Sequence, residues 1–377
     1  MTSRVLRMET FKSGPFSFSI NYNREKFLPY AIKAKELMVT IKDIPILPEL
    51  VSQLSTEIIM KSIFSTAALE GNPLSQEEVS KILQSKDKEQ SKKRVEKEIQ
   101  NLKLVYNKLE EVQPLPSPYL LKEEEIKLLH KIITDGCMDE KDGAPGNYRN
   151  HEVKVGDEKH GGVYKPPKCL DDVRNLMKVY VDWLNSPDVL EEDLIIRPAL
   201  AHFYLGMIHP FGDGNGRLSR VVEAFLLKSA GMKFVPPMLS NFYYKNIDDY
   251  YWAFTLSENN SEQDISPFLE FYFKGLIGSL EEVKSFITWK IRALVLRDYY
   301  IFLRKKRDLT EHQFDLLIAL LEKSESFKLT DLFDKDRYRI IYRNVSERTA
   351  RRDLEKLQKK ALLVTKEGMY SLNFFIL

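Results

Sequence analysis

The stretch that decides the fold is "HPFGDGNGRLSR", residues 209–220, which holds a histidine, an acid, three glycines and two arginines. One apolar helical run ends just before it and another begins within it, so the stretch is a loop that leads into a helix N-terminus. Gly212, Gly214 and Gly216 are expected to adopt positive φ, so that several backbone N–H groups converge on one anion. The helix dipole favours the same anion. The sequence therefore predicts a phosphate-binding loop.

The charged residues of the stretch have complementary chemistry. Arg217 and Arg220 lie three positions apart in the first helical turn, where both can reach one polyphosphate. Asp213 would repel a phosphate directly but suits Mg²⁺, which bridges carboxylates and phosphates. His209 is the group that can accept a proton near neutral pH. Together these residues indicate a catalytic nucleotide site.

The stretch resembles the signature of the Fic (Fido-fold) family, His-Pro-Phe-x-Asp-Gly-Asn-Gly-Arg-x-x-Arg, at every specified position. "PGNYR" and a hairpin before "PP" upstream, and "DDYY" downstream, extend the similarity over about residues 115–280. The resemblance implies a protein adenylyltransferase, an enzyme that moves AMP from ATP to a Ser, Thr or Tyr hydroxyl of a target protein. ATP and Mg²⁺ are the implied substrate and cofactor.

The same resemblance assigns roles to individual residues. His209 would deprotonate the target hydroxyl, and Asp213 would hold Mg²⁺. Phe211 would anchor the loop in the core. The residues assigned to nucleotide binding are Glu70, Gly214, Asn215, Gly216, Arg217, Arg220 and Tyr250. Within this set, Arg220 would meet the γ-phosphate, Asn215 would also fix the loop, and Tyr250 would lie beside the adenine.

A glycine-rich segment upstream is predicted to form a β-hairpin within the helical domain. Val153, Val155 and Val163 are its strand candidates. The segment 153–164 resembles the family's flap, which holds a target segment by adding a strand to its edge. The additional residues "DEKHGG" depart from the family pattern.

A second motif, "TAALEGN", lies at the end of a predicted helix. Thr66, Glu70 and Gly71 fit the family's inhibitory pattern, Ser/Thr-x-x-x-Glu-Gly/Asn. An acid near a helix C-terminus is unfavourable there, which invites a cationic partner elsewhere. The resemblance implies that Glu70 pairs with Arg220 and inhibits the enzyme. In some relatives the same glutamate supports removal of AMP, so de-AMPylation is a further implied activity.

The chain is expected to be mainly α-helical, with a Fido-fold core and a β-hairpin flap. We predict a helical N-terminal region carrying the inhibitory motif over residues 1–113 and a catalytic domain over residues 114–280. A long linking helix and a winged helix-turn-helix domain are predicted over residues 281–377, where three helices precede a strand pair. Three prolines mark the first boundary: Pro114, Pro116 and Pro118.

The C-terminal part carries the basic charge of the chain. The 377 residues have a net charge of +2, but residues 301–377 contain 17 Lys and Arg against 12 Asp and Glu. In the segment "SERTARRDLEK", Ser346 is a candidate N-cap, and Arg348, Arg352 and Lys356 recur every four residues. This face is interpreted either as a DNA-recognition helix or as a protein-docking or solvated surface, because acids are interspersed.

Composition indicates an ordinary soluble protein, with 43% hydrophobic and 30% charged residues. The N-terminal stretch lacks a secretion signal, and no run is long enough to span a membrane, so we expect a cytoplasmic protein. Cys137 and Cys169 are expected to be free thiols. Self-modification and homodimerisation are left open.

Two other functions compete with AMP transfer. The first is a Fic-fold transferase of another group, namely UMP, phosphate or phosphocholine. The second is a DNA-binding regulator whose Fic core senses nucleotide without catalysis. The intact His209 argues against the regulator, since a sensor needs no base.

Overall fold

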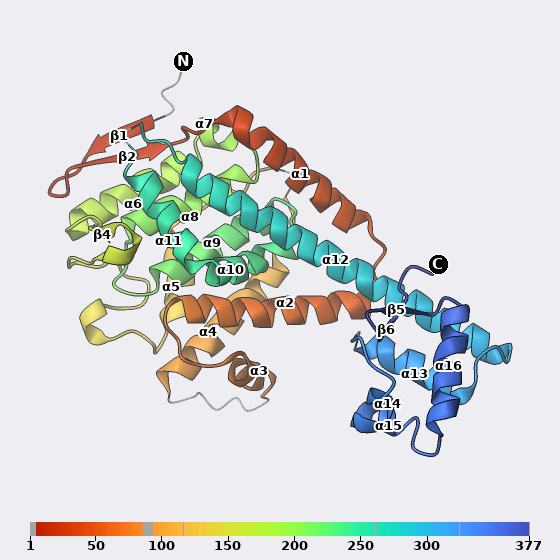
Figure 1. The fold of residues 1–377 in the computed structure, drawn as a ribbon. Coiled ribbons are helices and arrows are strands. Elements are labelled where there is room, and N and C mark those ends of the chain that lie inside the picture. Colours follow the sequence, from red (N-terminus) through yellow and green to blue (C-terminus); the bar gives the residue numbers. More distant parts are fainter. Residues whose placement is uncertain (1–4, 86–92, 116, 261, 324, 377) are drawn as a thin grey trace. The chain divides into compact units, whose positions relative to one another are not determined.

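A computed structural model of the chain describes residues 5–85, 93–115, 117–260, 262–323 and 325–376 (Figure 1). Pro116 of the proline-rich boundary therefore lies outside the described residues, as do the first four residues of the predicted N-terminal region. The chain divides into two compact units, Met1–Lys284 and Ser285–Leu377. None of the described helices combines the length and the apolar character needed to cross a membrane.

The first unit begins with a hairpin and a long helix. Strands β1 (Val5–Glu9) and β2 (Pro15–Ser19) pair antiparallel and precede helix α1 (Arg24–Asp43). Phe18 of β2 is fully buried against Trp183 and Tyr204, which fastens the hairpin to the helical core. This hairpin was not predicted from the sequence, because the alternation of apolar and polar residues in its strands is short.

Three helices follow and carry the second motif. They are α2 (Pro48–Leu69), α3 (Gln76–Gln84) and α4 (Arg94–Glu111). Gly71 has φ +81°, the left-handed conformation that ends a helix and that glycine adopts without strain. Ser75 and Glu78 form a capping box at the start of α3. A buried cluster that includes Ile63, Ile99 and Leu102 packs α2 against α4.

The core of the first unit consists of helices that surround α8 and α9. Its described helices are α5 (Glu123–Thr134), α6 (Leu170–Leu184), α7 (Pro187–Leu190), α8 (Ile196–Ile208), α9 (Asn215–Ser229), α10 (Val235–Lys245) and α11 (Ile247–Glu258). Helix α8 is buried along almost its whole length. It ends at His209, so the loop of residues 209–214 joins two buried helices.

The predicted hairpin is present but shorter than expected. Strand β3 spans Val155–Asp157 and pairs antiparallel with β4 (Gly162–Tyr164), with Val155 opposite Tyr164. Val153 is outside the strand, so its assignment as a strand residue was wrong. A 3₁₀ turn, Glu158–His160, joins the strands.

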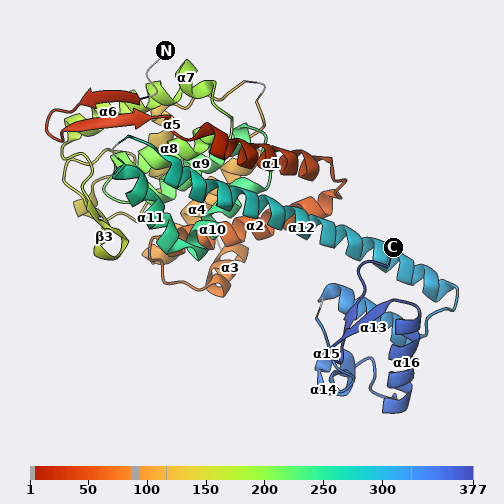
Figure 2. The same ribbon diagram turned by 45° about the horizontal axis from the view of Figure 1, so that its top comes forward.

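Helix α12 (Ser266–Lys305) extends from the first unit into the second. In its first part, Phe273 stacks on Phe27 of α1, and both views show the two helices side by side (Figure 2). The helix is longer than the sequence analysis expected, since its pattern was recognised only from about residue 280.

The second unit has its own core. After α12 come α13 (Glu311–Glu322), α14 (Asp331–Asp334), α15 (Asp336–Arg339), α16 (Glu347–Lys359) and the antiparallel pair β5 (Leu363–Lys366) and β6 (Met369–Leu372). Leu316, Leu354 and Leu357 are fully buried within it. Ser346 caps α16 as expected, since its hydroxyl accepts a hydrogen bond from the Thr349 N–H. The winged-helix assignment remains a prediction.

Candidate active site

The loop between α8 and α9 has a special backbone at two positions. His209 has φ +49° and Gly214 has φ +82°, so both are in the left-handed region. Gly212 and Gly216 do not have positive φ, and the expectation that they would was wrong. They are required for space: a Cβ on Gly212 would lie 2.0 Å from the Asp142 carbonyl oxygen, and one on Gly216 would lie 2.3 Å from Glu70 Oε1.

Side chains from within and beneath the loop fix its shape. Phe211 is fully buried and stacks on the His130 ring, with centroids 3.6 Å apart. Asn215 bonds Phe211 twice: its Nδ2 donates to the carbonyl at 2.8 Å, and its Oδ1 accepts from the N–H at 3.0 Å. These contacts agree with the anchoring roles that the resemblance implied.

His130 of α5 is a site residue that the sequence analysis missed. Its Nδ1 accepts from the Gly146 N–H at 2.9 Å, so Nε2 carries the proton and donates to the Asp213 carbonyl at 2.8 Å. Burial lowers the pKa of His130 to about 4, so the ring is neutral at neutral pH. The only sequence signal was a histidine on the apolar face of a helix.

Arg149 secures the other end of the loop. Its Nε donates to the His209 carbonyl at 2.7 Å, and its backbone N–H donates to the Pro210 carbonyl at 3.0 Å. Burial lowers the pKa of Arg149 to about 10. The segment "PGNYR" was noted in the sequence, but no role was assigned to its arginine.

His209 is held in the tautomer that a base needs. Its Nδ1 lies 3.2 Å from the Gly206 carbonyl and donates to it, so the Nε2 lone pair is available to accept a proton. Burial, together with the positive charge of Arg149, lowers the pKa of His209 to about 4. The imidazole is therefore neutral at neutral pH.

Asp213 and Arg217 bind each other. Arg217 Nη2 donates to Asp213 Oδ1 at 2.8 Å, and Arg217 Nη1 lies 3.2 Å from Glu98 Oε1. Asp213 also faces Arg94. Burial opposes ionisation of Asp213, but Arg217 and the Gly214 N–H lower its pKa below the ordinary value. Among the described residues, no group of three or more His, Cys, Asp or Glu side chains is arranged to hold a metal ion.

Arg220 is paired with Glu70 across 150 residues of sequence. Its Nη2 lies 2.6 Å from Glu70 Oε1 and 3.2 Å from the Thr66 carbonyl oxygen. Burial opposes both charges, yet the mutual attraction lowers the pKa of Glu70 and raises that of Arg220. The Glu70 carboxylate also lies against Gly216, in the first turn of α9. It therefore occupies an anion position at a helix N-terminus.

Tyr250 of α11 lies near the Glu70–Arg220 pair. It is 6% exposed, and its hydroxyl is 2.9 Å from His202 Nε2. The other ring nitrogen of His202 lies 2.5 Å from Glu223, which also accepts from the Tyr243 hydroxyl. Tyr250 is therefore held by a buried polar network.

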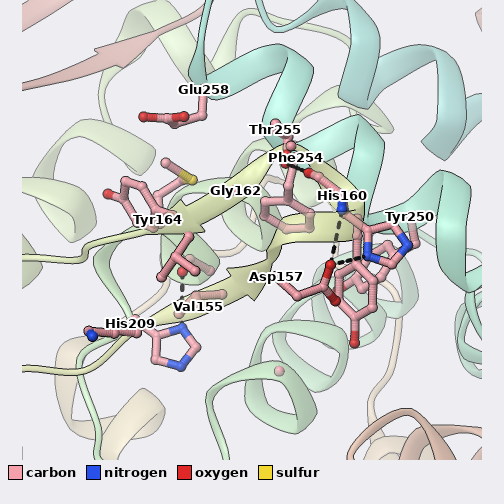
Figure 3. A pocket seen from close by; sticks show the side chains of 18 of the residues that line it. Val155, Asp157, His160, Gly162, Tyr164, His209, Tyr250, Phe254, Thr255 and Glu258 are labelled. Atoms are coloured by element: carbon pink, nitrogen blue, oxygen red, sulfur yellow. Dashed lines mark hydrogen bonds and ion pairs between the residues drawn. The ribbon is translucent and has the colours of Figure 1, made fainter.

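The hairpin is fastened to α11 through the "DEKHGG" segment. His160 is buried, and its Nδ1 lies 2.8 Å from Asp157 Oδ1 (Figure 3). Its Nε2 lies 2.9 Å from Asp248 Oδ1. The Thr255 hydroxyl donates to the His160 carbonyl at 2.8 Å. The bond to Asp248 in particular raises the pKa of His160. The additional residues thus tie the predicted flap to the helix that carries Tyr250.

A cavity of about 710 Å³ lies between the hairpin, α11 and the loop. Five of the residues predicted for the site line it: Glu70, His209, Gly216, Arg220 and Tyr250. Figure 3 shows His209 on the β3 side of the hairpin and Glu258 on the β4 side. The remaining predicted residues, Asp213, Gly214, Asn215 and Arg217, are not part of its lining but lie in the same loop and helix turn.

A histidine and a buried arginine paired with a carboxylate line this cavity, and a second buried arginine lies in the same helix turn. Residues 120–227 match the Fic/DOC family. The chain therefore carries a Fic/DOC family domain, as its signature predicted.

Curated relatives with this domain are named protein adenylyltransferase Fic. The protein from Drosophila mojavensis is 30% identical over 218 residues, which are 57% of this chain and 39% of that protein. The protein from Nematostella vectensis is 34% identical over 126 residues, 33% of this chain and 26% of that protein. The chain thus spans between about a quarter and two fifths of the length of these relatives.

Solved structures share the fold. A Fic family protein from Desulfovibrio desulfuricans G20 gives a TM-score of 0.56 at 20% identity and covers 92% of this chain and 96% of its own. Fic-1 (aa134 - 508) from C. elegans gives a TM-score of 0.54 at 20% identity over 70% of this chain and 73% of its own. The mainly helical, Fic-type fold predicted from the sequence is confirmed.

Proposed function

We propose that the protein transfers AMP from ATP to a Ser, Thr or Tyr hydroxyl of a target protein. The observation that carries this proposal is the position of the Glu70 carboxylate, which Arg220 holds beside Gly216 at the N-terminus of α9. A helix N-terminus beside a buried arginine suits a phosphate for the same reasons that it suits this carboxylate. The name of the curated relatives supports ATP as the AMP donor.

Unused hydrogen-bond donors support the same substrate. Arg217 Nε and Arg220 Nε are buried and have no hydrogen-bond acceptor among the described residues. A buried guanidinium donor without an acceptor is costly, so such groups are expected to meet an anionic ligand. Phosphate oxygens would satisfy them.

The transfer step follows from the position of His209. Its Nε2 would take the proton of the target hydroxyl as the hydroxyl oxygen attacks the α-phosphorus. The bond between the α-phosphorus and the bridging oxygen breaks, AMP stays on the target, and pyrophosphate leaves. Arg217, Arg220 and the backbone N–H groups from Gly214 to Gly216 would bind the phosphates during this step.

Asp213 fits a role in holding Mg²⁺. Magnesium in nucleotide sites is commonly bound by one or two carboxylates together with substrate phosphates, so a single aspartate beside the phosphate position is sufficient. When bound, Mg²⁺ would neutralise charge that develops on the phosphates. Asp213 must first exchange contacts with Arg217 and Arg94 for contacts with the metal.

Glu70 is proposed to inhibit the enzyme. Its carboxylate contacts the arginine that the γ-phosphate would need and lies on Gly216 in the same helix turn. Two anions cannot share this position, so ATP has to displace Glu70 or bind in a weakened manner. Removal of AMP from a modified target, assisted by Glu70, belongs to the same proposal.

The hairpin and Tyr250 are proposed to position the two substrates. Residues 153–164 present strand edges at the cavity, where an extended target segment can pair with the backbone. Tyr250 lines the cavity from α11 and would contact the nucleoside. The protein itself is one accessible target. A cytoplasmic setting fits two free cysteines and a need for ATP.

Isotope position identifies the transferred group. Protein with the Glu70→Ala substitution would be incubated with cell lysate and ATP labelled at the α- or the γ-phosphate. AMP transfer labels proteins from α-labelled ATP alone, and His209→Ala in the same background abolishes it. Label from γ-labelled ATP would instead indicate phosphate transfer, and equal labelling with the His209 variant would exclude His209 as the base.

A second activity is proposed for the C-terminal unit. Arg348, Arg352 and Lys356 lie on the exposed face of α16, opposite the buried Leu354 and Leu357. Such a face can contact the phosphates of duplex DNA. We expect the full chain to bind duplex DNA with an affinity that falls steeply as the salt concentration rises. Reversing these three charges should abolish the binding. Absence of DNA binding would favour a protein-docking or solvated surface for this face.

A further inference from the structure

A network of ion pairs joins α4 to the loop at the predicted metal and phosphate side chains. Arg94 Nη2 lies 3.3 Å from Asp213 Oδ2, and Arg94 Nη1 lies 2.9 Å from Asp139. One turn further along α4, Glu98 Oε1 lies 3.2 Å from Arg217 Nη1. We call Arg94 and Glu98 the α4 clamp.

Both carboxylate oxygens of Asp213 are engaged by these contacts. Oδ1 accepts from Arg217 Nη2 at 2.8 Å and from the Gly214 N–H at 2.6 Å. Oδ2 faces the Arg94 guanidinium. A divalent cation on Oδ2 would lie within a few ångströms of that guanidinium, and like charges at such a separation repel strongly. Metal binding at Asp213 therefore requires Arg94 to withdraw.

Glu98 acts on the neighbouring arginine in the same way. Its carboxylate is largely buried, and it neutralises Arg217, whose side chain is 2% exposed. A phosphate approaching Arg217 would meet the negative charge of Glu98 beside it. The clamp thus opposes both ligands of the proposed site, the cation through Arg94 and the anion through Glu98.

The clamp is physically connected to Glu70. Asn72 Nδ2 donates to Glu98 Oε2 at 2.8 Å and to the Val95 carbonyl at 3.0 Å. Only Gly71 separates Asn72 from Glu70. A movement that withdraws Glu70 from Arg220 therefore pulls on the side chain that holds Glu98 in place.

We propose that Arg94 and Glu98 form a second inhibitory contact, which holds Asp213 and Arg217 in a state that excludes Mg²⁺–nucleotide until α4 is released. This inference rests on the proposed nucleotide function. It differs from the Glu70 contact, because it acts on the metal ligand and on the other arginine. Arg94 and Glu98 are positioning residues, since they act through the side chains that would touch the ligands.

Two binding measurements separate the two parts of the clamp. Both use full-length protein carrying Glu70→Ala and His209→Ala, so that ATP binds without turnover. The first is calorimetric titration with MgCl₂ at saturating ATP, and the second is titration with ATP in the presence of EDTA. Thermal unfolding confirms that each variant is folded.

Arg94→Ala is expected to lower the Mg²⁺ concentration at half-saturation by about fivefold or more, the lower end of ordinary coupling between sites. Its affinity for ATP in EDTA should change much less. Glu98→Gln should instead raise the affinity for ATP in EDTA by a similar factor. Arg94→Lys, which keeps the charge, and Lys93→Ala, which removes a neighbouring exposed charge, are the controls and should retain the parent values.

The outcomes distinguish the clamp from the proposed function. The clamp alone would be refuted if the protein binds ATP but neither substitution has its expected effect. In that case Arg94→Ala would not lower the Mg²⁺ concentration at half-saturation, and Glu98→Gln would not change the ATP affinity in EDTA. Absence of ATP binding in the parent protein would refute the proposed nucleotide site, and the clamp with it.

Discussion

Replacing Glu70 with alanine should strengthen ATP binding and lower the free energy of unfolding of the nucleotide-free protein. The substitution removes the acceptor of the 2.6 Å contact to Arg220 and leaves the contact of Arg220 Nη2 with the Thr66 carbonyl in place. Arg220 is 2% exposed at its side chain and Glu70 is 28% exposed, so the pair is largely shielded from water. The same contact that stabilises the resting protein is the one that ATP must break.

The magnitude can be worked from the kind of contact. A hydrogen bond to a charged group contributes about 1.5–3 kcal/mol, and ATP no longer has to replace it in the variant. The affinity for ATP should therefore rise roughly 10- to 150-fold, since each 1.4 kcal/mol is about a factor of ten. Without nucleotide, an unpaired buried arginine should lower the free energy of unfolding by about 3 kcal/mol.

Calorimetric titration with ATP and urea unfolding measure the two effects. Glu57→Ala is a matched control, because Glu57 lies on the same helix and pairs only with half-buried Lys61 among the contacts described. Saturating ATP should return part of the lost stability, since it supplies Arg220 with a new anion. Equal ATP affinities for the wild type, the Glu70 variant and the control would refute the reasoning, whatever the effect on stability.

Three further predictions concern other parts of the molecule. His209→Ala should reduce transfer by about 10²- to 10⁴-fold, the usual contribution of a general base, while ATP affinity is retained in calorimetry. His130 has a pKa of about 4 in the folded chain, below its ordinary value, so the unfolded chain gains a proton first as the pH falls. The contribution of His130 to the free energy of unfolding should be complete above about pH 6.5 and smaller by about 2 kcal/mol at pH 5, and His130→Gln should remove this part of the pH dependence in urea unfolding. In the second unit, Gln313 Nε2 donates to buried Asp353 at 2.7 Å, and Gln313→Leu should cost about 1–3 kcal/mol because it leaves the carboxylate unsatisfied.

The sequence predicted most of the site because its residues are close together in the chain. Seven of the nine predicted site residues lie in the stretch from His209 to Arg220, where loop and helix geometry restrict where they can point. Glu70 was assigned from a short motif by resemblance, and the structure brings it to Arg220. The candidate N-cap Ser346 predicted the start of α16, because a capping residue is a local feature of the sequence.

The residues that the sequence did not reveal act through tertiary contacts. His130 stacks under Phe211 from another helix, and Arg149 binds main-chain carbonyls of the loop. The spacing of residues along the sequence does not indicate such contacts. The glycines show the same limit: Gly212 is required by the Asp142 carbonyl and Gly216 by the Glu70 carboxylate, not by their own backbone angles. Glycine is required at these two positions because other residues lie close to them in space, and the periodicity of the sequence does not show such proximity.

Peptide mass spectrometry of a modified target tests the central claim most directly. Lysate proteins incubated with ATP and the Glu70→Ala protein should carry AMP on Ser, Thr or Tyr side chains, and lysate treated with the protein that also carries His209→Ala should not. Adducts of UMP, phosphate or phosphocholine in place of AMP, with the matching donor supplied, would contradict the assignment of the group. AMP-bearing peptides of equal abundance in both samples would contradict the assignment of the site.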